Sequence, residues 1–525
     1  MITVKNIRLP LKYTDDSVCD VLSRVLKISR NSIISANISR LSVDARKKND
    51  VHYIASIDAE IDGNEKKLVD KNKNAHISVR DEYCFPYSKS LKTKPVVIGS
   101  GPAGLFCALM LARAGASPII IERGEPVEKR TETINTFWQK GKLDIESNVQ
   151  FGEGGAGTFS DGKLNTGTND IRSRFILKEF VRHGAPEEIL ISAKPHIGTD
   201  KLKPTIIAIR KEIESLGGEF HFNTKFTDIL LKDGKLIGVK TQCGSSVEVI
   251  DTEYAVLAIG HSARDTFELL RDRGIEMQQK AFSIGARIEH LRADVDECQY
   301  GKARHFLPAA DYKLSTHLGC GRGVYTFCMC PGGYVVNASS ENGLLCTNGM
   351  SCFARDNVNS NSALLVGVLP EDYNCGDVLD GMKLQRQIER SAYELTKGYF
   401  APVQRVGDFL GINTGRKSNV EPSIKPGYSF CDISKIYPEF ISDSMKEGII
   451  RLSEKMSVFE DMGAVLTAAE TRSSSPVRIL RNETYQSVSC IGLYPCGEGA
   501  GYAGGIMSAA ADGIKCAEAI FDNQK

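Results

Sequence analysis

Residues 96–124 read VVIGSGPAGLFCALMLARAGASPIIIERG, and this stretch decides the fold. Its first residues, 96–98, predict a short strand that is buried on both faces. Gly99, Gly101 and Gly104 follow with G-x-G-x-x-G spacing, and an apolar stretch with helical period then begins. In this pattern the first glycine permits a tight turn and the second lets the backbone approach a pyrophosphate. The third allows the helix to pack closely on the strand.

A second apolar run, residues 119–121, leads to Glu122, which lies eighteen residues after Gly104. An acidic side chain at this spacing meets the ribose hydroxyls of an adenine dinucleotide, and the helix N-terminus offers free N–H groups to the phosphates. A G-x-G-x-x-G motif alone is a weak signal, but here the strand, helix, second strand and acid are in register. We therefore predict a dinucleotide site that includes Gly99, Ser100, Gly101, Pro102, Ala103, Gly104, Glu122 and Arg123.

The length and composition restrict the class of protein. With 525 residues, the chain is too long for one ordinary core, so two or three domains are expected. Apolar residues make up 42% and charged residues 25%, as is typical of a globular protein. The net charge of +1 offers no overall attraction to nucleic acid or to an anionic membrane. We expect a small-molecule substrate rather than nucleic acid or a membrane; the composition leaves the oligomeric state open.

The N-terminus and the cysteines favour the cytoplasm. The opening MITVKNIRLP lacks the apolar core of a signal peptide and the Arg/Ser bias of a transit peptide. No apolar run reaches the length of a bilayer span. Fifteen cysteines are scattered without the spacing of a disulfide scaffold or a zinc site. These features predict a cytoplasmic protein with reduced thiols and no bound metal.

Residues 1–88 predict a small separate domain. The hydrophobic patterns give the order β-α-β-β-α-β, which is that of a ferredoxin-like sandwich, here without cluster ligands. The elements are expected at residues 2–11, 17–27, 33–45, 51–61, 65–72 and 75–83. The polar stretch 88–94 then indicates a linker.

A second glycine-rich stretch, FGEGGAGTFSDGKLNTG, covers residues 151–167. No buried strand precedes it, so it does not predict a second nucleotide fold. A long stretch without apolar periodicity inside a globular chain is more often functional than idle. We predict a loop that turns backbone N–H groups toward the cofactor, and the alternative is an ordinary surface loop. The residues expected at the cofactor are Gly154, Gly155, Ala156 and Gly157.

Two later segments again combine a short buried strand with a glycine at its end. A ladder of short strands is expected at residues 219–223, 226–232, 235–241 and 246–250, followed by a buried strand that stops at Gly260. Near the C-terminus a short strand leads to a turn with an acid, and an Ala-rich helix begins at a pair of glycines. The N-terminus of such a helix suits the electron-rich edge of a reduced flavin. The cofactor residues predicted in these segments are Phe226, Gly260, Gly497, Glu498, Gly504, Gly505 and Ile506.

Together the three separated pieces resemble the flavin-binding fold of the glutathione-reductase-like superfamily. In that superfamily the acid of the last turn holds the ribitol and pyrophosphate. It is commonly Asp, and here it is Glu498, which implies a longer reach or a bridging water.

Longer strings resemble one family more closely. FGEGGAGTFSDGKLNT, AIGHSARDTFELL, ETRSSSPVRILR and LYPCGEGAGYAGGI are similar to strings in bacterial and plastid proteins called uncharacterised FAD-dependent dehydrogenases, or NAD(P)/FAD-dependent oxidoreductases. The resemblance covers roughly residues 1–520. It implies FAD and an oxidoreductase, and it implies no particular substrate.

The predicted fold class is α/β. We expect a Rossmann-like FAD-binding domain built from separated segments, with an inserted α+β substrate domain and the small N-terminal ferredoxin-like domain. The parts are residues 1–88 for the N-terminal domain, 94–280 and 483–525 for the FAD-binding domain, and 281–482 for the insert. The predicted function is hydride transfer between a small organic substrate and the flavin. No second strand, G-x-G-x-x-G and helix unit is present in the sequence, which leaves NAD(P)H open as a transient co-substrate.

The catalytic residues are harder to predict, because the flavin carries the chemistry. His261 follows the strand that ends at Gly260 and could act as an acid or base near neutral pH. Arg264 could favour an anionic substrate or the reduced flavin, although a helix-capping pair with Asp265 is an equal alternative. Arg472, in a polar loop, could hold a substrate carboxylate, and a solvated turn is the competing interpretation.

Cys328 and Cys330 form a C-x-C motif just before a Pro-Gly-Gly turn. A thiol beside a flavin could relay electrons or form an adduct. Because C-x-C spacing gives a strained disulfide, we interpret the pair as two small residues that line a pocket beside the turn.

Two other classes of function remain open. An RNA-modifying flavoenzyme would use the N-terminal domain for binding and would need a basic surface stripe, which the balanced charge does not predict. A non-catalytic flavin electron-transfer protein would lack a closed pocket beside the isoalloxazine ring.

Overall fold

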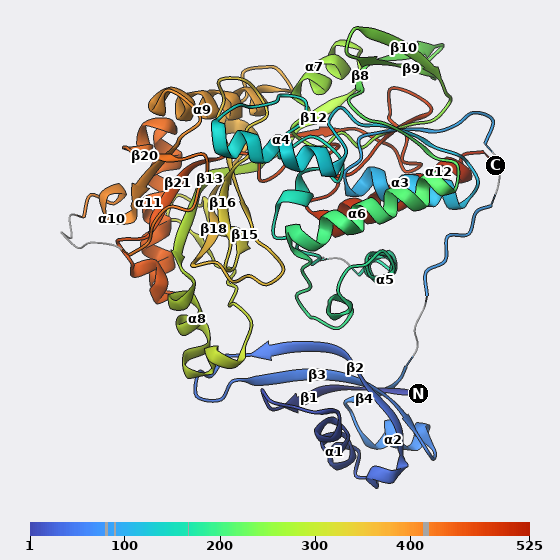
Figure 1. The fold of residues 1–525 in the computed structure, drawn as a ribbon, viewed down its shortest axis with the longest axis vertical. Coiled ribbons are helices and arrows are strands. Elements are labelled where there is room, and N and C mark those ends of the chain that lie inside the picture. Colours follow the sequence, from blue (N-terminus) through green and yellow to red (C-terminus); the bar gives the residue numbers. More distant parts are fainter. Residues whose placement is uncertain (79–81, 89–90, 166, 168, 413–418, 525) are drawn as a thin grey trace.

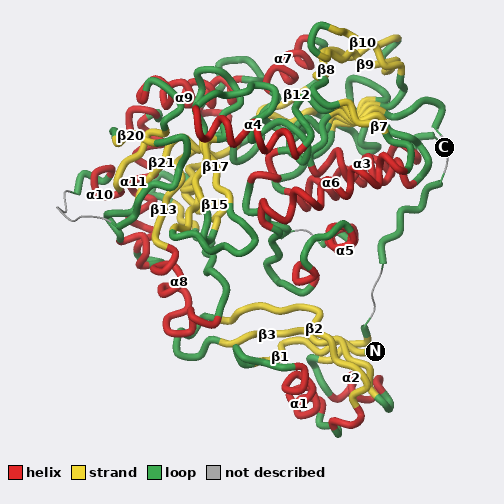
Figure 2. The backbone as a smooth tube through the Cα atoms, viewed as in Figure 1, coloured by secondary structure: helices red, strands yellow, loops and turns green. Residues whose placement is uncertain are grey.

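The chain builds a parallel sheet, a larger mixed sheet beside it and a separate N-terminal sheet, as the computed structural model shows (Figures 1 and 2). The structure describes residues 1–78, 82–88, 91–165, 167, 169–412 and 419–524. Parts of two predictions, the strand at 75–83 and the linker at 88–94, therefore lie outside the described residues, as does Thr166 of the glycine-rich stretch. The fold class is mixed α/β with a parallel sheet, in agreement with the sequence.

The parallel sheet contains five short strands in the order β23-β11-β5-β6-β7. Their bounds are β5 Val96–Ile98, β6 Ile119–Ile121, β7 Glu219–His221, β11 Ala255–Leu257 and β23 Leu493–Pro495. All neighbours in this sheet run parallel, and the strands come from three distant stretches of the chain. The sheet is therefore a doubly covered α/β sheet, in which apolar strands are buried on both faces.

Different structures cover the two faces of this sheet. One face, with Val97, Ile120 and Val256, packs against three helices: α3 Pro102–Arg113, α6 Gly198–Ser215 and α12 Ile506–Asp522. Side chains on the other face of the same strands pack against the helix α7 Arg264–Asp272 and a three-stranded antiparallel sheet. The strands of that small sheet are β8 Lys225–Lys232, β9 Lys235–Cys243 and β10 Ser246–Asp251. Because side chains alternate along a strand, each strand serves both layers.

One strand of the predicted four-strand ladder belongs to a different sheet, so the prediction is wrong for that strand. The segment expected at 219–223 forms β7, which pairs parallel with β6 at the edge of the main sheet. The other three strands form the antiparallel sheet β10-β9-β8, with the predicted tight turn between β8 and β9. The sequence of a three-residue strand is too short to predict which sheet the strand joins. Here α6 precedes β7 and connects it to the edge of the sheet beside β6.

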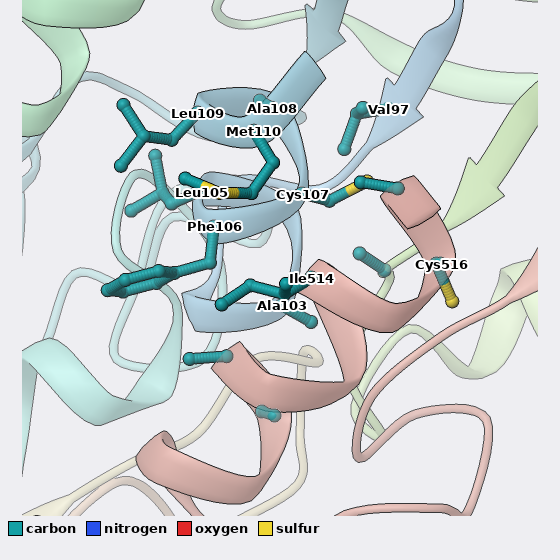
Figure 3. Packing of buried hydrophobic residues seen from close by; sticks show 14 of the residues in the cluster. Val97, Ala103, Leu105, Phe106, Cys107, Ala108, Leu109, Met110, Ile514 and Cys516 are labelled. Carbon is teal, nitrogen blue, oxygen red and sulfur yellow. The ribbon is translucent and has the colours of Figure 1, made fainter. Parts of the chain in front are cut away.

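The helices α3 and α12 cross at very close range (Figure 3). A Cβ atom placed on Gly513 of α12 would lie 2.0 Å from the carbonyl oxygen of Ala103 in α3. At the start of α3, a Cβ on Gly104 would lie 1.9 Å from the carbonyl oxygen of Gly99. The third glycine of the motif thus permits close packing, as the sequence predicts.

The mixed sheet contains seven strands in the order β14-β15-β18-β13-β21-β19-β20. Their bounds are β13 Phe282–Leu291, β14 Ser315–His317, β15 Gly323–Cys330, β18 Asn359–Val368, β19 Ala401–Arg405, β20 Tyr428–Phe430 and β21 Val465–Glu470. Two flanking strands, β12 Met277–Gln279 and β22 Val477–Ile479, pair with each other where the chain enters and leaves this region. A further hairpin is formed by β16 Tyr334–Asn337 and β17 Thr347–Met350. The region is therefore an insertion between consecutive parts of the parallel sheet.

The remaining described helices surround these sheets. They are α4 Val127–Lys140, α5 Arg172–Arg182, α8 Arg292–Tyr300, α9 Asp380–Thr396, α10 Val406–Phe409 and α11 Glu439–Ser453. Short 3-10 turns include Ala156–Phe159, in the glycine-rich stretch, and Gly301–Phe306, after α8. Within the described ranges, no helix combines the length and the apolar character needed to cross a bilayer.

The N-terminal sheet has the order β2-β3-β1-β4, with the helices α1 and α2 on one side (Figure 1). The bounds are β1 Ile2–Leu9, α1 Asp15–Leu26, β2 Ile33–Asp44, β3 His52–Ile61, α2 Glu65–Lys71 and β4 Ala75–Ile77. All three strand pairs are antiparallel. Among the contacts of this sheet with the rest of the chain, the backbone of Leu41 exchanges hydrogen bonds with Ile191 and Ala193, and Val43 packs against the core of the mixed sheet.

We predict that Gly513→Ala destabilises the protein by roughly 1–3 kcal/mol. Helix propensity alone would favour Ala by about 1 kcal/mol, but the added Cβ has no room against the Ala103 carbonyl. Thermal unfolding checks this, with Gly319→Ala as the control, because Gly319 is exposed and has no heavy atom within 4 Å of its added Cβ. Equal melting temperatures for the two variants would contradict the close helix crossing.

Candidate functional site

A large cavity lies at the carboxyl edge of the parallel sheet. Its volume is about 720 Å³, within the usual range for small-molecule and cofactor sites. The turns that follow β5, β6, β11 and β23 all line it, and so do residues of β15 and β21 from the mixed sheet. Ligands of open α/β sheets bind at this edge, so the fold positions the cavity where the sequence predicts the cofactor.

The turn between β5 and α3 forms one wall of the cavity. Gly99 has a φ of 101°, and a Cβ there would lie 2.3 Å from the carbonyl oxygen of Ala258. Gly101, the N-cap of α3, faces open space: the nearest atom to an added Cβ is the Cα of Gly155, at 3.8 Å. The first-turn N–H groups of α3 have no partners within the helix, and together with the helix dipole they favour an anion here.

Glu122 lies at the end of β6 and is almost completely buried. Its Oε2 accepts hydrogen bonds from the backbone N–H and the hydroxyl of Ser100, at 3.0 and 2.7 Å. Its Oε1 accepts from the N–H groups of Gly124 and Gly152, at 2.9 and 3.0 Å. The carboxylate lines the cavity as expected, but its contacts with three turns show that it also holds these turns together.

The glycine-rich stretch passes under this turn and is largely buried, so the alternative of an ordinary surface loop is wrong. A Cβ on Gly155 would lie 3.0 Å from the Cα of Gly101, and one on Gly157 would lie 3.0 Å from the side chain of Ile506. Gly154 instead packs against Thr158 and Ile206, behind the cavity wall.

Arg130 of α4 fixes the glycine-rich stretch. Its fully buried guanidinium donates to the backbone carbonyls of Asn148, Val149, Gly152, Glu153 and Gly155, at 2.6 to 3.2 Å. Burial lowers the pKa of Arg130 to about 10, so it stays charged at neutral pH. Arg130 was not singled out from the sequence. The signal was present, because Arg130 shares the apolar helical face of Val127, Ile134 and Phe137.

The N-terminus of α12 and the turn after β11 form the far end of the cavity. Gly504 and Gly505 precede α12 and leave open space where a Cβ would be. Burial raises the pKa of Glu498 to about 7, and His261 Nε2 lies 3.6 Å from its Oε1. Burial and the charges of Arg472 and Arg264 lower the pKa of His261 to about 3. The expectation that His261 titrates near neutral pH is therefore wrong, and its ring is neutral there.

Arg264 and Arg472 belong to a buried ion cluster around Glu389 of α9. The Glu389 carboxylate accepts from Arg264 at 2.8 and 2.9 Å and from Arg472 at 2.8 and 2.9 Å. Burial opposes ionisation of Glu389, but the two guanidinium groups outweigh it and hold its pKa well below the usual value. The predicted Arg264–Asp265 pair is wrong, because Asp265 pairs with Arg123 at 3.0 Å. Arg472 reaches the cavity, yet its guanidinium already holds a protein carboxylate.

The mixed sheet contributes a polar group of side chains to the cavity. Cys328, at the end of β15, and Glu470, at the end of β21, line the cavity together with Lys163. Lys163 donates to the backbone carbonyl of Met329. Burial raises the pKa of Glu470 to about 7, against the opposing charge of Arg287, whose Nη1 lies 3.5 Å from its Oε1. Lys163 was not singled out from the sequence, because its contact with Met329 comes from a strand far away in the chain.

Most of the predicted site residues line the cavity. Those that do are Gly99, Ser100, Gly101, Pro102, Ala103, Glu122, Arg123, Gly155, Ala156, Gly157, Phe226, Gly260, His261, Cys328, Arg472, Glu498, Gly504, Gly505 and Ile506. Those behind the wall are Gly104, Gly154, Arg264, Cys330 and Gly497. The glycines of the second group serve close packing, since a Cβ on Gly497 would lie 2.8 Å from the Cβ of Ala103.

The buried Glu470 predicts a pH-dependent stability. Its pKa is about 7 in the folded protein and about 4.5 when exposed, so its stabilising contribution is complete below about pH 4.5. That contribution is lost as the pH rises through about 7, because the unfolded chain releases the proton more easily. When the pH rises from about 5.5 to about 7.5, the free energy of unfolding should therefore fall by about 2 kcal/mol more in the native chain than in Glu470→Gln. Denaturant unfolding at both pH values checks this, and Glu483→Gln, at an exposed position, should behave like the native chain.

Three domain models match parts of the chain. A model of an FAD binding domain matches residues 94–157, and a model described as FAD-dependent protein, C-terminal domain-like, matches residues 281–473. A domain of unknown function matches residues 1–60. The FAD model thus falls on the β5–α3 turn and the start of the glycine-rich stretch.

Solved structures similar to this chain include several flavoproteins. The flavin-dependent brominase Bmp2 is 14% identical, with 83% of this chain and 79% of that chain covered and a TM-score of 0.38. The flavin-dependent halogenase CmlS is 13% identical, with 82% and 58% covered and a TM-score of 0.36. A geranylgeranyl bacteriochlorophyll reductase-like protein from Thermoplasma acidophilum is 12% identical, with 83% and 80% covered and a TM-score of 0.34. Scores this low identify neither a reaction nor a substrate.

A relative in Clostridium beijerinckii matches over nearly the whole length. This protein, described as uncharacterized, is 46% identical over 530 residues, with 99% of this chain and 98% of the relative covered. Identity at this level over both full lengths establishes common membership of one family. The chain therefore belongs to the same family as this Clostridium beijerinckii protein, and the two FAD domain models make it an FAD-dependent family.

Proposed function

We propose that the protein is an FAD-dependent oxidoreductase that transfers a hydride between a small organic substrate and the flavin. One observation carries the proposal. The cavity does not end at the dinucleotide turns but continues to the mixed sheet, where Lys163, Cys328 and Glu470 line it. A protein that only stored or relayed electrons would not need a polar chamber beside the cofactor.

The residues at the sheet edge fit FAD. Gly101 leaves the space that a pyrophosphate needs at the N-terminus of α3, and a Cβ would fill it. Glu122 and Arg123 lie where the adenosine half is expected, and the Arg123 guanidinium stacks on Phe151 at 4.1 Å. Gly504 and Gly505 leave the N-terminus of α12 open toward the opposite end of the cavity.

Bound FAD would supply the two-electron chemistry. The chain contributes orientation, electrostatics and proton handling. The positive dipole end of α12 favours negative charge on a reduced cofactor. Glu470, with a pKa of about 7, can accept or donate a proton near neutral pH, whereas the neutral ring of His261 serves as a hydrogen-bonding group.

The proposal extends to the electron donor, the domains and the compartment. The sequence carries one strand, G-x-G-x-x-G and helix unit, which fits either direct reduction of the flavin by the substrate or a transient NAD(P)H donor. Residues 94–280 and 483–525 would form the FAD-binding domain, 281–482 the substrate domain and 1–88 a ferredoxin-like domain. All fifteen cysteines are free thiols, which supports a reducing compartment such as the cytoplasm.

We predict that Gly101→Ala weakens FAD binding at least tenfold while leaving the fold intact. The φ of Gly101 is −70°, which Ala adopts without strain, and the added Cβ meets no atom closer than 3.8 Å. The methyl group would therefore clash with the cofactor alone. Flavin fluorescence titration measures the affinity, with Gly319→Ala as the control. An unchanged FAD affinity of Gly101→Ala would show that the pyrophosphate does not bind at this turn.

The reaction class is tested by anaerobic stopped-flow reduction of the FAD-loaded protein. The visible flavin band is followed after mixing with NADH, with NADPH or with a panel of hydroxy acids, amino acids and amines. Rapid bleaching by a nicotinamide would make the protein a reductase, and bleaching by a metabolite alone would make it a dehydrogenase. Glu470→Gln should slow the reduction, and Glu483→Gln should not. A protein that takes up no FAD would overturn the proposal.

A further inference from the structure

The C-x-C motif lies at an irregular end of β15, next to the cavity. Pairing with β18 shifts register between Phe327 and Cys330, and Cys328 has a φ of 43°. Cys328 is half-buried and lines the cavity, whereas Cys330 is fully buried behind it. The Cys330 thiol lies 3.3 Å from the backbone carbonyl oxygen of Cys328, so the irregularity of β15 brings the Cys330 sulfur close to the Cys328 main chain.

Two cations hold this short segment. Arg287 Nη2 donates to the Cys328 carbonyl at 2.9 Å and lies 3.5 Å from the Cys330 sulfur. Lys163 donates to the carbonyl of Met329, the residue between the two cysteines. A thiolate is stabilised in such electropositive surroundings, and thiolates are the reactive form of cysteine.

The charges around the two thiols make them unequal. The neighbouring Cys330 thiol lowers the pKa of Cys328 below its usual value against the effect of burial, and the charges of Lys163 and Arg287 lower it further. The same contact, together with burial, raises the pKa of Cys330 well above the usual value. The nearby acids are Asp161, which Arg355 neutralises at 2.5 Å, and Glu470, which faces Arg287.

A second feature points to a ligand at this place. The Oε2 atom of Glu470 is buried and has no hydrogen-bond partner among the described residues. Buried polar atoms in proteins are nearly always partnered. An oxygen without a partner in a cavity wall therefore indicates a position where a bound molecule completes the contacts.

We propose that Cys328 and Cys330 form a redox-active dithiol that reduces a small-molecule disulfide bound in the cavity. This goes beyond our interpretation of the pair as two small lining residues. It rests on the proposed flavin function for one point only, the electrons that restore the dithiol.

The exchange has two balanced steps. The Cys328 thiolate attacks one sulfur of the substrate RSSR′, which forms the Cys328–SR mixed disulfide and releases R′S⁻. Cys330 then loses its proton and attacks the Cys328 sulfur, which forms the Cys328–Cys330 disulfide and releases RS⁻. The substrate gains two electrons and the protein dithiol loses two. The two-electron donor that restores the dithiol is the reduced flavin of the proposed function.

The test follows the release of thiopyridone from dithiodipyridine at about pH 6, using the FAD-loaded protein with its flavin oxidised and its cysteines reduced. Cys328 should react about tenfold faster than an ordinary thiol, since its larger thiolate fraction outweighs its lower nucleophilicity. In the native protein the fast phase should release two thiopyridone molecules and leave an internal disulfide, seen as the loss of two hydrogens in the peptide with both cysteines. Cys330→Ser should release one and keep a pyridyl group on Cys328, and Cys328→Ser should lose the fast phase. Cys320→Ser, which removes an exposed thiol, should keep it.

Two results would overturn the proposal. One is a fast phase that persists in Cys328→Ser, and the other is native protein that keeps a pyridyl group on Cys328 without an internal disulfide. Peptide masses of the native protein alone decide the second point, so the test does not depend on the folding of a variant. No flavin reduction occurs in this assay, so failure of the stopped-flow experiment leaves its outcome unaffected.

Discussion

Close approach of backbone to backbone at the carboxyl edge of the parallel sheet is the constraint on which this structure depends. A Cβ on Gly99 would lie 2.3 Å from the Ala258 carbonyl oxygen, and one on Gly499 would lie 2.6 Å from the carbonyl oxygen of Gly260. The turns after β5, β11 and β23 can therefore meet only because side chains are missing there. Their meeting creates the wall of the cavity, and with it the place where the exposed N–H groups of α3 and α12 face a ligand.

Buried charged side chains fix the segments that have little regular secondary structure. Arg130 fixes the start of the glycine-rich stretch and the residues just before it by donating to five backbone carbonyl groups between Asn148 and Gly155. Glu389 joins the segment after β21, through Arg472, to the first turn of α7, through Arg264. Removing one partner of such a buried ion cluster leaves an unpaired charge, which is strongly destabilising. The Glu389 cluster thus ties the end of the mixed sheet to α7, which packs on the parallel sheet.

The two sheets contribute different kinds of groups to the cavity, which explains why the cavity suits chemistry as well as binding. The parallel sheet supplies backbone groups and a few charges to the cavity. The mixed sheet supplies Cys328, whose pKa lies below its usual value, and Glu470, whose pKa of about 7 lies near neutral pH. Groups with such shifted pKa values in a cavity are candidates for reaction steps. The proposed hydride transfer and the proposed dithiol exchange both use this side of the cavity.

The local features could be predicted from the sequence: the strand, glycine turn and helix at residues 96–113, the succession of elements in the first 77 residues and the helix near the C-terminus that begins at two glycines. These depend on hydrophobic period and on turn residues, which are properties of neighbours in the chain. Three other features depend on the folded chain: the sheet that β7 joins, the pairing of Arg264 with Glu389 rather than Asp265, and the neutral ring of His261. Ion pairing, burial and pKa depend on groups brought together from distant parts of the chain. Patterns among neighbouring residues therefore do not predict those partners.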